Sequence, residues 1–170
     1  MKNLKSPSVR YCPVLFVSLV IFGSCSTPSK NSSDSGVFWI GEADSFTGAE
    51  AADGLSANRG MAMAVEEVNS RGGVHGKKVE LVALDAQSRT DEAARATTRL
   101  VSRDRVSAIV SGATSSNILA MAPIAQGARV PTVATVATNP KVTSQGDFIF
   151  RICFIDPFQG EIMAKFASRH

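Results

Sequence analysis

The chain has 170 residues, of which 44% are hydrophobic and 6% aromatic, with 18 basic and 15 acidic residues. Three of the basic residues precede Cys25 and all the acidic residues follow it, so the remainder of the chain carries 15 charges of each sign. This balance excludes the basic, aromatic-rich surface that nucleic-acid binding requires, and we expect no nucleic-acid partner.

Residues 1–24 have the pattern of an export signal. Three basic side chains, Lys2, Lys5 and Arg10, precede an apolar run at residues 13–22. This run is about half as long as the apolar stretch that a membrane-spanning helix needs. The pattern therefore favours a signal peptide that is removed over a permanent transmembrane helix.

The end of this segment, FGSC at residues 22–25, resembles the lipobox of bacterial lipoproteins, in which the cysteine is lipidated and the chain is then cleaved in front of it. We therefore predict a lipoprotein signal peptide over residues 1–24 and a lipid anchor on Cys25. Ordinary cleavage near Ser24, which would leave Cys25 as a free thiol, is the alternative. The polar, serine-rich stretch that follows predicts a flexible tether over residues 25–36.

From residue 37 onward, short apolar runs alternate with stretches of helical spacing. Strands are predicted at residues 37–43, 79–84, 107–110, 130–133 and 147–154. Helices are predicted at residues 55–71 and 90–101, and in a third stretch with an apolar stripe at Ile118, Met121, Ala122 and Ala125. This alternation with short connections predicts an α/β fold, with a mostly parallel open sheet and helices on both faces.

In open parallel sheets, ligands bind beyond the carboxyl ends of the strands. That rule selects the loops at residues 44–54, 111–117 and 134–140. The second loop is rich in hydroxyl groups and precedes a helix, where Ser115 and Ser116 together with free backbone N–H groups favour an anion such as a carboxylate. The alternative is that these serines, like the hydroxyl group of the third loop, only cap helices and turns.

Short motifs follow one another in a fixed order along the chain. They are FTG at 46–48, AVEEVN at 64–69, GG at 72–73, DAQ at 85–87, AIVSG at 108–112, ATNP at 137–140, FR at 150–151 and DPFQG at 156–160. This series resembles the leucine/isoleucine/valine-binding protein family, whose members bind branched-chain amino acids for ABC transporters. The resemblance covers residues 37–170, nearly the whole chain after the predicted tether.

The resemblance implies the type I periplasmic-binding-protein fold, in which two α/β lobes trap a small ligand between them. Residues 37–150 would then form the N-terminal part of the first lobe. Residues 151–170 would form the crossover and the start of the second lobe. Because members of the family are more than twice as long, we expect a truncated member with the second lobe largely missing.

The resemblance also implies candidate ligand contacts. Ser115 and Thr138 match positions that bind the α-carboxylate and ammonium groups of the ligand, and Val136 and Ala137 match positions that contribute backbone groups. The family usually places an aromatic side chain over the ligand at the position of Asp53. A carboxylate in that place predicts a more polar or amide-bearing ligand as an alternative to leucine, isoleucine or valine.

The function implied by the resemblance is that of an exported lipoprotein that captures an amino acid or a small amide for an ABC importer. Its partners would be the membrane permease and the membrane itself, through Cys25, on the periplasmic or cell-surface side. A sensory or regulatory binding module of the same fold, and a truncated surface lipoprotein without transport activity, are the alternatives.

We expect no enzyme activity, no metal and no cofactor. The two histidines, His75 and His170, are not part of any nucleophile–base or metal-ligand pattern. Cys153 has no partner for a disulfide if Cys25 carries a lipid and Cys12 is removed with the signal peptide. The glycines at 72, 73 and 76 follow a helix rather than a strand, which excludes a dinucleotide-binding loop.

Overall fold

The computed structural model describes residues 36–169, so the predicted signal peptide, the lipid site at Cys25 and nearly all of the tether lie outside the described residues. Within residues 36–169, no helix is both long enough and apolar enough to span a membrane.

A single sheet of five parallel strands organises the described residues, in the order β2-β1-β3-β4-β5. The predicted α/β fold with a parallel sheet is therefore confirmed. β1 and β2 pair along their whole length, from Val37 opposite Lys78 to Asp44 opposite Asp85. The strands are β1 (Val37–Asp44), β2 (Lys78–Asp85), β3 (Ala108–Ser111), β4 (Thr132–Ala134) and β5 (Ile149–Arg151).

Helices connect successive strands, and they are α1 (Ala51–Ser70), α2 (Thr90–Ser102), α3 (Ser115–Ala128), the short 3₁₀ helix η1 (Thr143–Gln145) and, after β5, α4 (Asp156–Ala167). α1 begins four residues before the predicted start at residue 55. Gly54 lies in the first turn of this helix. A side chain would not fit there, because a Cβ atom would lie 2.0 Å from the Ser45 carbonyl oxygen. β5 is shorter than the predicted strand at 147–154.

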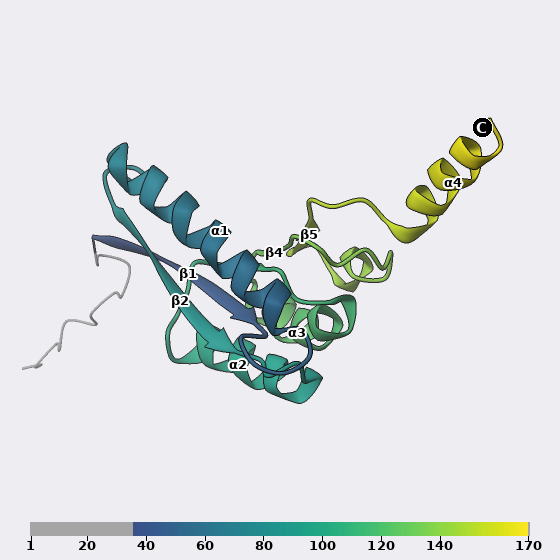
Figure 1. Cartoon of the computed structure of the whole chain (residues 1–170). Coiled ribbons are helices and arrows are strands. Elements are labelled where there is room, and N and C mark those ends of the chain that lie inside the picture. Colours follow the sequence, from purple (N-terminus) through teal and green to yellow (C-terminus); the bar gives the residue numbers. More distant parts are fainter. Residues whose placement is uncertain (1–35, 170) are drawn as a thin grey trace, which may run out of the picture. The chain divides into compact units, whose positions relative to one another are not determined.

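Helices lie on both faces of the sheet, as predicted (Figure 1). Successive residues of a strand point to opposite faces. Gly41 of β1 faces α2, because a Cβ atom at Gly41 would lie 3.0 Å from Leu100 of that helix. The next residue, Glu42, accepts a hydrogen bond from Asn58 of α1 at 2.6 Å. α1 and α2 therefore cover opposite faces of β1.

The hydrophobic core includes the fully buried side chains of Leu100, Ile109, Ile118 and Met121, from α2, β3 and α3. The segment from β5 to the end of α4 differs from this core, because α4 contains no buried residue. Ile149 of β5 is buried in the core, but many large apolar side chains after it are exposed, namely Phe150, Ile152, Phe154, Phe158, Ile162, Met163 and Phe166.

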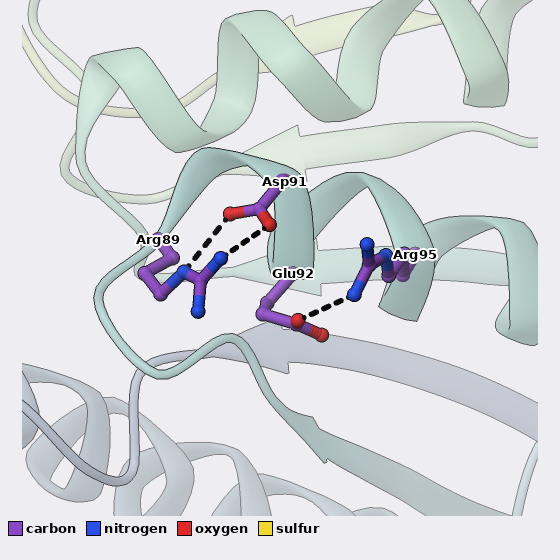
Figure 2. A network of polar contacts seen from close by, with 4 residues as sticks. All are labelled: Arg89, Asp91, Glu92 and Arg95. Atoms are coloured by element: carbon purple, nitrogen blue, oxygen red, sulfur yellow. Dashed lines mark hydrogen bonds and ion pairs between the residues drawn. The ribbon is translucent and has the colours of Figure 1, made fainter.

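Charged side chains at the start of α2 form two surface ion pairs (Figure 2). Arg89 donates to both carboxylate oxygens of Asp91, at 3.1 and 2.6 Å, and Arg95 donates to Glu92 at 2.8 Å. The hydrogen bond from Arg89 lowers the pKa of Asp91. Both acids lie in the first turn of α2, where negative charge is favourable to the helix dipole. Exposed pairs of this kind orient the helix end and contribute little stability.

Loss of buried volume at the central strand should destabilise this fold. We expect Ile109→Ala to lower the free energy of unfolding by about 2–5 kcal/mol, because Ile109 is fully buried and its side chain would leave a cavity. The matched control is Ile152→Ala, since Ile152 is 73% exposed and its loss should change stability by about 0.5 kcal/mol or less. Urea unfolding followed by circular dichroism measures both, and equal losses would contradict the described core.

Candidate functional site

An open hollow of about 420 Å³ lies at the carboxyl ends of β1, β3 and β4. Its volume falls within the usual range for small-ligand sites. The first turns of α1 form one side, and the chain that leaves β3 and β4 forms the other. The residues that line it are Asp53, Ser56, Ala57, Gly112, Thr135 and Val136.

A narrow recess of about 30 Å³ adjoins this hollow, sharing Asp53, Gly112 and Val136 with it, and is also lined by Ser45, Glu50, Gly54, Ala113 and Thr114. The carboxylate of Glu50 accepts hydrogen bonds from the Ser45 hydroxyl at 3.2 Å and from the Asn117 amide at 3.0 Å. Glu50 thereby joins the loop after β1 to the first turn of α3. The side chain of Asn117 is 2% exposed, so this bond is held within the protein.

The carboxylate of Asp44 connects the ends of β1 and β3 beneath the hollow. It accepts hydrogen bonds from the Ser111 hydroxyl and, at 2.8 Å, from the Gly112 N–H. Gly112 cannot carry a larger side chain here, because a Cβ atom would lie 2.5 Å from the Cβ of Ala57 in α1. The missing side chain at Gly112 therefore lets α1 approach the end of β3.

Two buried acids, Glu42 and Asp44, lie on the same face of β1, and both are fully inaccessible to solvent. Burial raises the pKa of Glu42 to about 7; the Asn58 hydrogen bond acts against this rise, and the neighbouring Asp44 carboxylate adds to it. Burial also raises the pKa of Asp44, although the bonds from Ser111 and Gly112 limit the rise. The Oε1 atom of Glu42 has no hydrogen-bond partner among the described residues. Near neutral pH, Glu42 therefore exchanges its proton.

The turn after β1 is organised by Asp85, the last residue of β2. One carboxylate oxygen accepts from the backbone N–H of Phe46 at 2.8 Å and of Gln87 at 2.8 Å, and the other accepts from the Thr47 hydroxyl at 2.6 Å. Burial alone would raise the pKa of Asp85, but these hydrogen bonds together lower it. The ionised carboxylate thus holds the Thr47–Gly48 turn and, through it, the start of α1.

The residues predicted to bind the ligand carboxylate, Ser115, Ser116 and Thr138, differ in how far their side chains are exposed. Ser115 is half-buried, and its hydroxyl accepts the N–H of Asn139 at 3.2 Å, which links the loops after β3 and β4. Ser116 is exposed, and its hydroxyl lies 3.2 Å from that of Thr114. Thr138 is half-buried, and its carbonyl accepts the N–H of Asp156 at 3.1 Å. The Ser115 hydroxyl thus has a structural role, but it joins the start of α3 to the loop after β4 and does not cap a helix as the alternative predicted.

The loop after β4 is supported from behind by Arg151, the last residue of β5. Its guanidinium group donates to the carbonyl oxygens of Ala137 at 3.3 Å and Asn139 at 2.8 Å. The thiol of Cys153 donates to the same Ala137 carbonyl at 3.5 Å. The Ala137 carbonyl, a candidate ligand contact, is thus already engaged, and Ala137 itself is 1% exposed. Val136, in contrast, is exposed and lines the hollow.

The structure thus brings Asp53 and Val136 together around one hollow. The other predicted contacts line neither the hollow nor the recess: Ser115 and Ser116 begin α3, and Ala137 and Thr138 lie in the loop after β4. Glu50, Ser56 and Thr135 also line this region and were not predicted from the sequence. Ser56 follows Asp53 by three residues, so the same helix face carries both. That signal was hidden because α1 was predicted to begin only at residue 55.

Metal-binding clusters and other hollows among the described residues would be further candidate sites. Among residues 36–169, no group of three or more His, Cys, Asp or Glu side chains is arranged to hold a metal ion. A second hollow, of about 430 Å³, is lined by residues of α2 and by Arg103 just after it, and shares no residue with the hollow at the strand ends. We assign it no role.

Comparison with protein families identifies a match to the periplasmic binding protein family over residues 39–167. An amino acid binding protein of Pseudomonas aeruginosa is 33% identical over 128 residues, which are 75% of this chain and 34% of that protein. A leucine-, isoleucine-, valine-, threonine- and alanine-binding protein of the same species is 32% identical over 130 residues, or 76% of this chain and 35% of that protein. The chain therefore spans about a third of the length of these relatives.

Solved structures show the same fold. The substrate-binding protein LivJ of Streptococcus pneumoniae, in complex with isoleucine, is 39% identical with a TM-score of 0.74, covering 78% of this chain and 38% of that protein. The leucine-binding protein LivK of Thermotoga maritima is 42% identical with a TM-score of 0.71, covering 76% of this chain and 36% of that protein. The relatives in these comparisons are substrate-binding proteins and not enzymes.

The raised pKa of Glu42 has a consequence for stability. The folded protein holds the Glu42 proton up to a pH of about 7, whereas the ordinary value is 4.5, so the stability present at low pH is lost as the pH rises through about 7. We expect the free energy of unfolding to fall by up to about 3 kcal/mol from pH 4.5 to 8 through this group.

Glu42→Gln should remove most of this pH dependence, because the amide stays neutral over the whole range. Urea unfolding at several pH values measures the slope. Glu66→Gln, on the exposed side of α1, is the control and should keep the slope of the unmodified protein. If Glu42→Gln keeps that slope as well, the protonated state assigned to Glu42 is wrong.

Proposed function

The chain belongs to the periplasmic binding protein family, and from this premise we propose that it captures an amino acid or a related small amide outside the cytoplasm for an ABC importer. The observation that carries the proposal is the hollow at the carboxyl ends of β1, β3 and β4. This is the edge at which open parallel sheets bind ligands. The names of the relatives and the isoleucine complex of LivJ support an amino acid as the ligand.

In this proposal the start of α3 binds the carboxylate of the ligand. The free N–H groups of a helix N-terminus attract negative charge, and the hydroxyls of Ser115 and Thr138 add donors. The N–H groups of Gly112 and Ala113 are already bonded to Asp44 and Ser111, so the donors come from α3 itself, and Val136 lies exposed at the hollow. Arg151 acts as a positioning residue, since it holds the carbonyl groups of the loop after β4.

A ligand in this hollow would be covered on one side only by the described residues. Small-molecule sites bury most of the ligand surface, so a second wall is needed for tight binding. The two-lobe architecture of the family would supply that wall from a facing lobe. We therefore propose that residues 37–150 contribute the first half of the site, and that these residues alone bind their ligand weakly.

We further propose that the protein reaches its place of action through the export signal at residues 1–24. The lipid on Cys25 would hold it at the membrane, near the permease that receives the ligand, and residues 25–36 would act as the tether. Anchoring needs no membrane-spanning helix in this arrangement, although one lipid group alone binds membranes weakly and two acyl chains hold firmly.

Ser115 and Thr138 provide the direct test of the binding proposal. We expect Ser115→Ala and Thr138→Ala each to weaken binding of the preferred amino acid by about 1–3 kcal/mol, because each removes a hydrogen bond to a charged carboxylate. NMR titration of the chain with a panel of amino acids measures weak binding. Ser102→Ala, an exposed serine of α2 distant from the hollow, is the matched control. Unchanged affinity in both variants would refute the two roles.

The lipid anchor has its own test. In a bacterial host, Cys25→Ala should prevent processing and leave a precursor of higher mass, because lipidation precedes cleavage at a lipobox. Treatment with globomycin, which blocks the lipoprotein signal peptidase, should leave a precursor of the unmodified chain. Cys153→Ala is the control and should be processed normally. Normal processing of Cys25→Ala, with no effect of globomycin, would establish ordinary signal cleavage instead.

A further inference from the structure

We infer that the hollow selects a ligand of net positive charge, such as an amino acid with a cationic side chain, and that Asp53 is the residue that selects it. This inference rests on the proposed amino acid-binding function and narrows the class of ligand. The juxtaposition that carries it is that of Asp53, which lines the ligand-sized hollow, and Glu50, which lines the narrow recess adjoining it, with no basic side chain lining either space.

Asp53 is the carboxylate that a ligand would meet first. It lies in the first turn of α1, is exposed, and lines both the hollow and the narrower recess. Its side chain takes no part in the ion pairs found among the described residues. Helix α1 therefore fixes the position of the Asp53 carboxylate at the hollow. A cationic group of the ligand could pair with it.

Glu50 adds a second negative charge in the recess that adjoins the hollow. Its carboxylate is oriented by two neutral donors, Ser45 and Asn117, which bond to one oxygen and leave the negative charge in place. No lysine or arginine lines the hollow or the recess. Beneath them, the carboxylate of Asp44 accepts the Gly112 N–H, so this backbone dipole does not point into the hollow to offset the negative charge.

The carboxylates of Asp53 and Glu50 favour a ligand of net positive charge. A zwitterionic amino acid with a neutral side chain carries one carboxylate and one ammonium group, so it leaves the two acids incompletely paired. An apolar side chain against Asp53 would also remove water from the carboxylate and offer no hydrogen bond in return, which is unfavourable. A cationic side chain would replace that water with a charge-assisted hydrogen bond. The α-carboxylate of the same ligand would still lie toward the start of α3.

A simpler explanation of Asp53 is that it stabilises α1, since acidic residues favour the first turn of a helix. The two explanations predict different measurements. A purely helical role would change the stability of the protein and leave the choice of ligand unaffected. Ligand selection would change the preference between two ligands of equal shape and different charge.

The test compares L-arginine with L-citrulline, which has nearly the same shape but a neutral urea in place of the guanidinium group, and with L-isoleucine. Each is titrated into the isotopically labelled chain and followed by NMR at residues of the hollow. We expect L-arginine to bind at least about tenfold more tightly than L-citrulline, because a hydrogen bond to a charged group is stronger than a neutral one. The preference should decrease at high salt, because Asp53 is exposed.

Asp53→Asn should abolish this preference, and Asp147→Asn, at an exposed aspartate away from the hollow, should retain it. Circular dichroism of both variants establishes that they are folded. If all three ligands bind equally to the unmodified chain, or if Asp53→Asn keeps the preference for L-arginine, the inference is wrong and the amino acid-binding proposal stands. If none of the three ligands shifts any resonance of the hollow, both the inference and the proposed function are overturned.

Discussion

The hydrogen bonds that the buried Asp44 carboxylate accepts from Ser111 and Gly112 are the interaction on which the candidate site depends. They join the carboxyl ends of β3, the central strand of the sheet, and its neighbour β1. With the ends tied, α1 and α3 begin beside each other, and Gly112 lets α1 approach closely. The hollow is the space that remains between these helix starts and the loop after β4.

The carboxyl end of β1 buries two acidic side chains, where most domains bury apolar ones. Glu42 and Asp44 have no contact with water, and burial of two neighbouring carboxyl groups is unfavourable unless one retains a proton. The carboxyl ends of the strands are therefore less stable than they would be with apolar side chains in place of the two acids. In return, Asp44, Asp85 and Arg151 each bond to the backbone of a loop near the hollow, and Glu50 bonds to the side chains of Ser45 and Asn117. A rigid frame of this kind orients ligand contacts before the ligand arrives.

Much of the fold follows from local pattern. Apolar runs and helical stripes predicted the five strands and the first three helices in the right order, and the loops at their carboxyl ends predicted the region of the site. The errors lie at element ends. α1 begins at Ala51 and not at residue 55, and its first turn includes Gly54, where the close approach of the Ser45 carbonyl leaves no room for a side chain. Such a contact joins distinct segments, and no local pattern reveals it.

The sequence by itself determined the α/β class and the family, because these depend on residue type, spacing and order. It also predicts an export signal and places Asp53 in a predicted ligand loop. Only the tertiary structure decided which side chains meet. It placed Glu50 between Ser45 and Asn117, turned the Ala137 carbonyl toward Arg151, and gathered Asp53, Ser56 and Thr135 around one hollow. The physical reason is that these contacts join strand ends distant along the chain, and the packing of helices across the sheet sets their geometry.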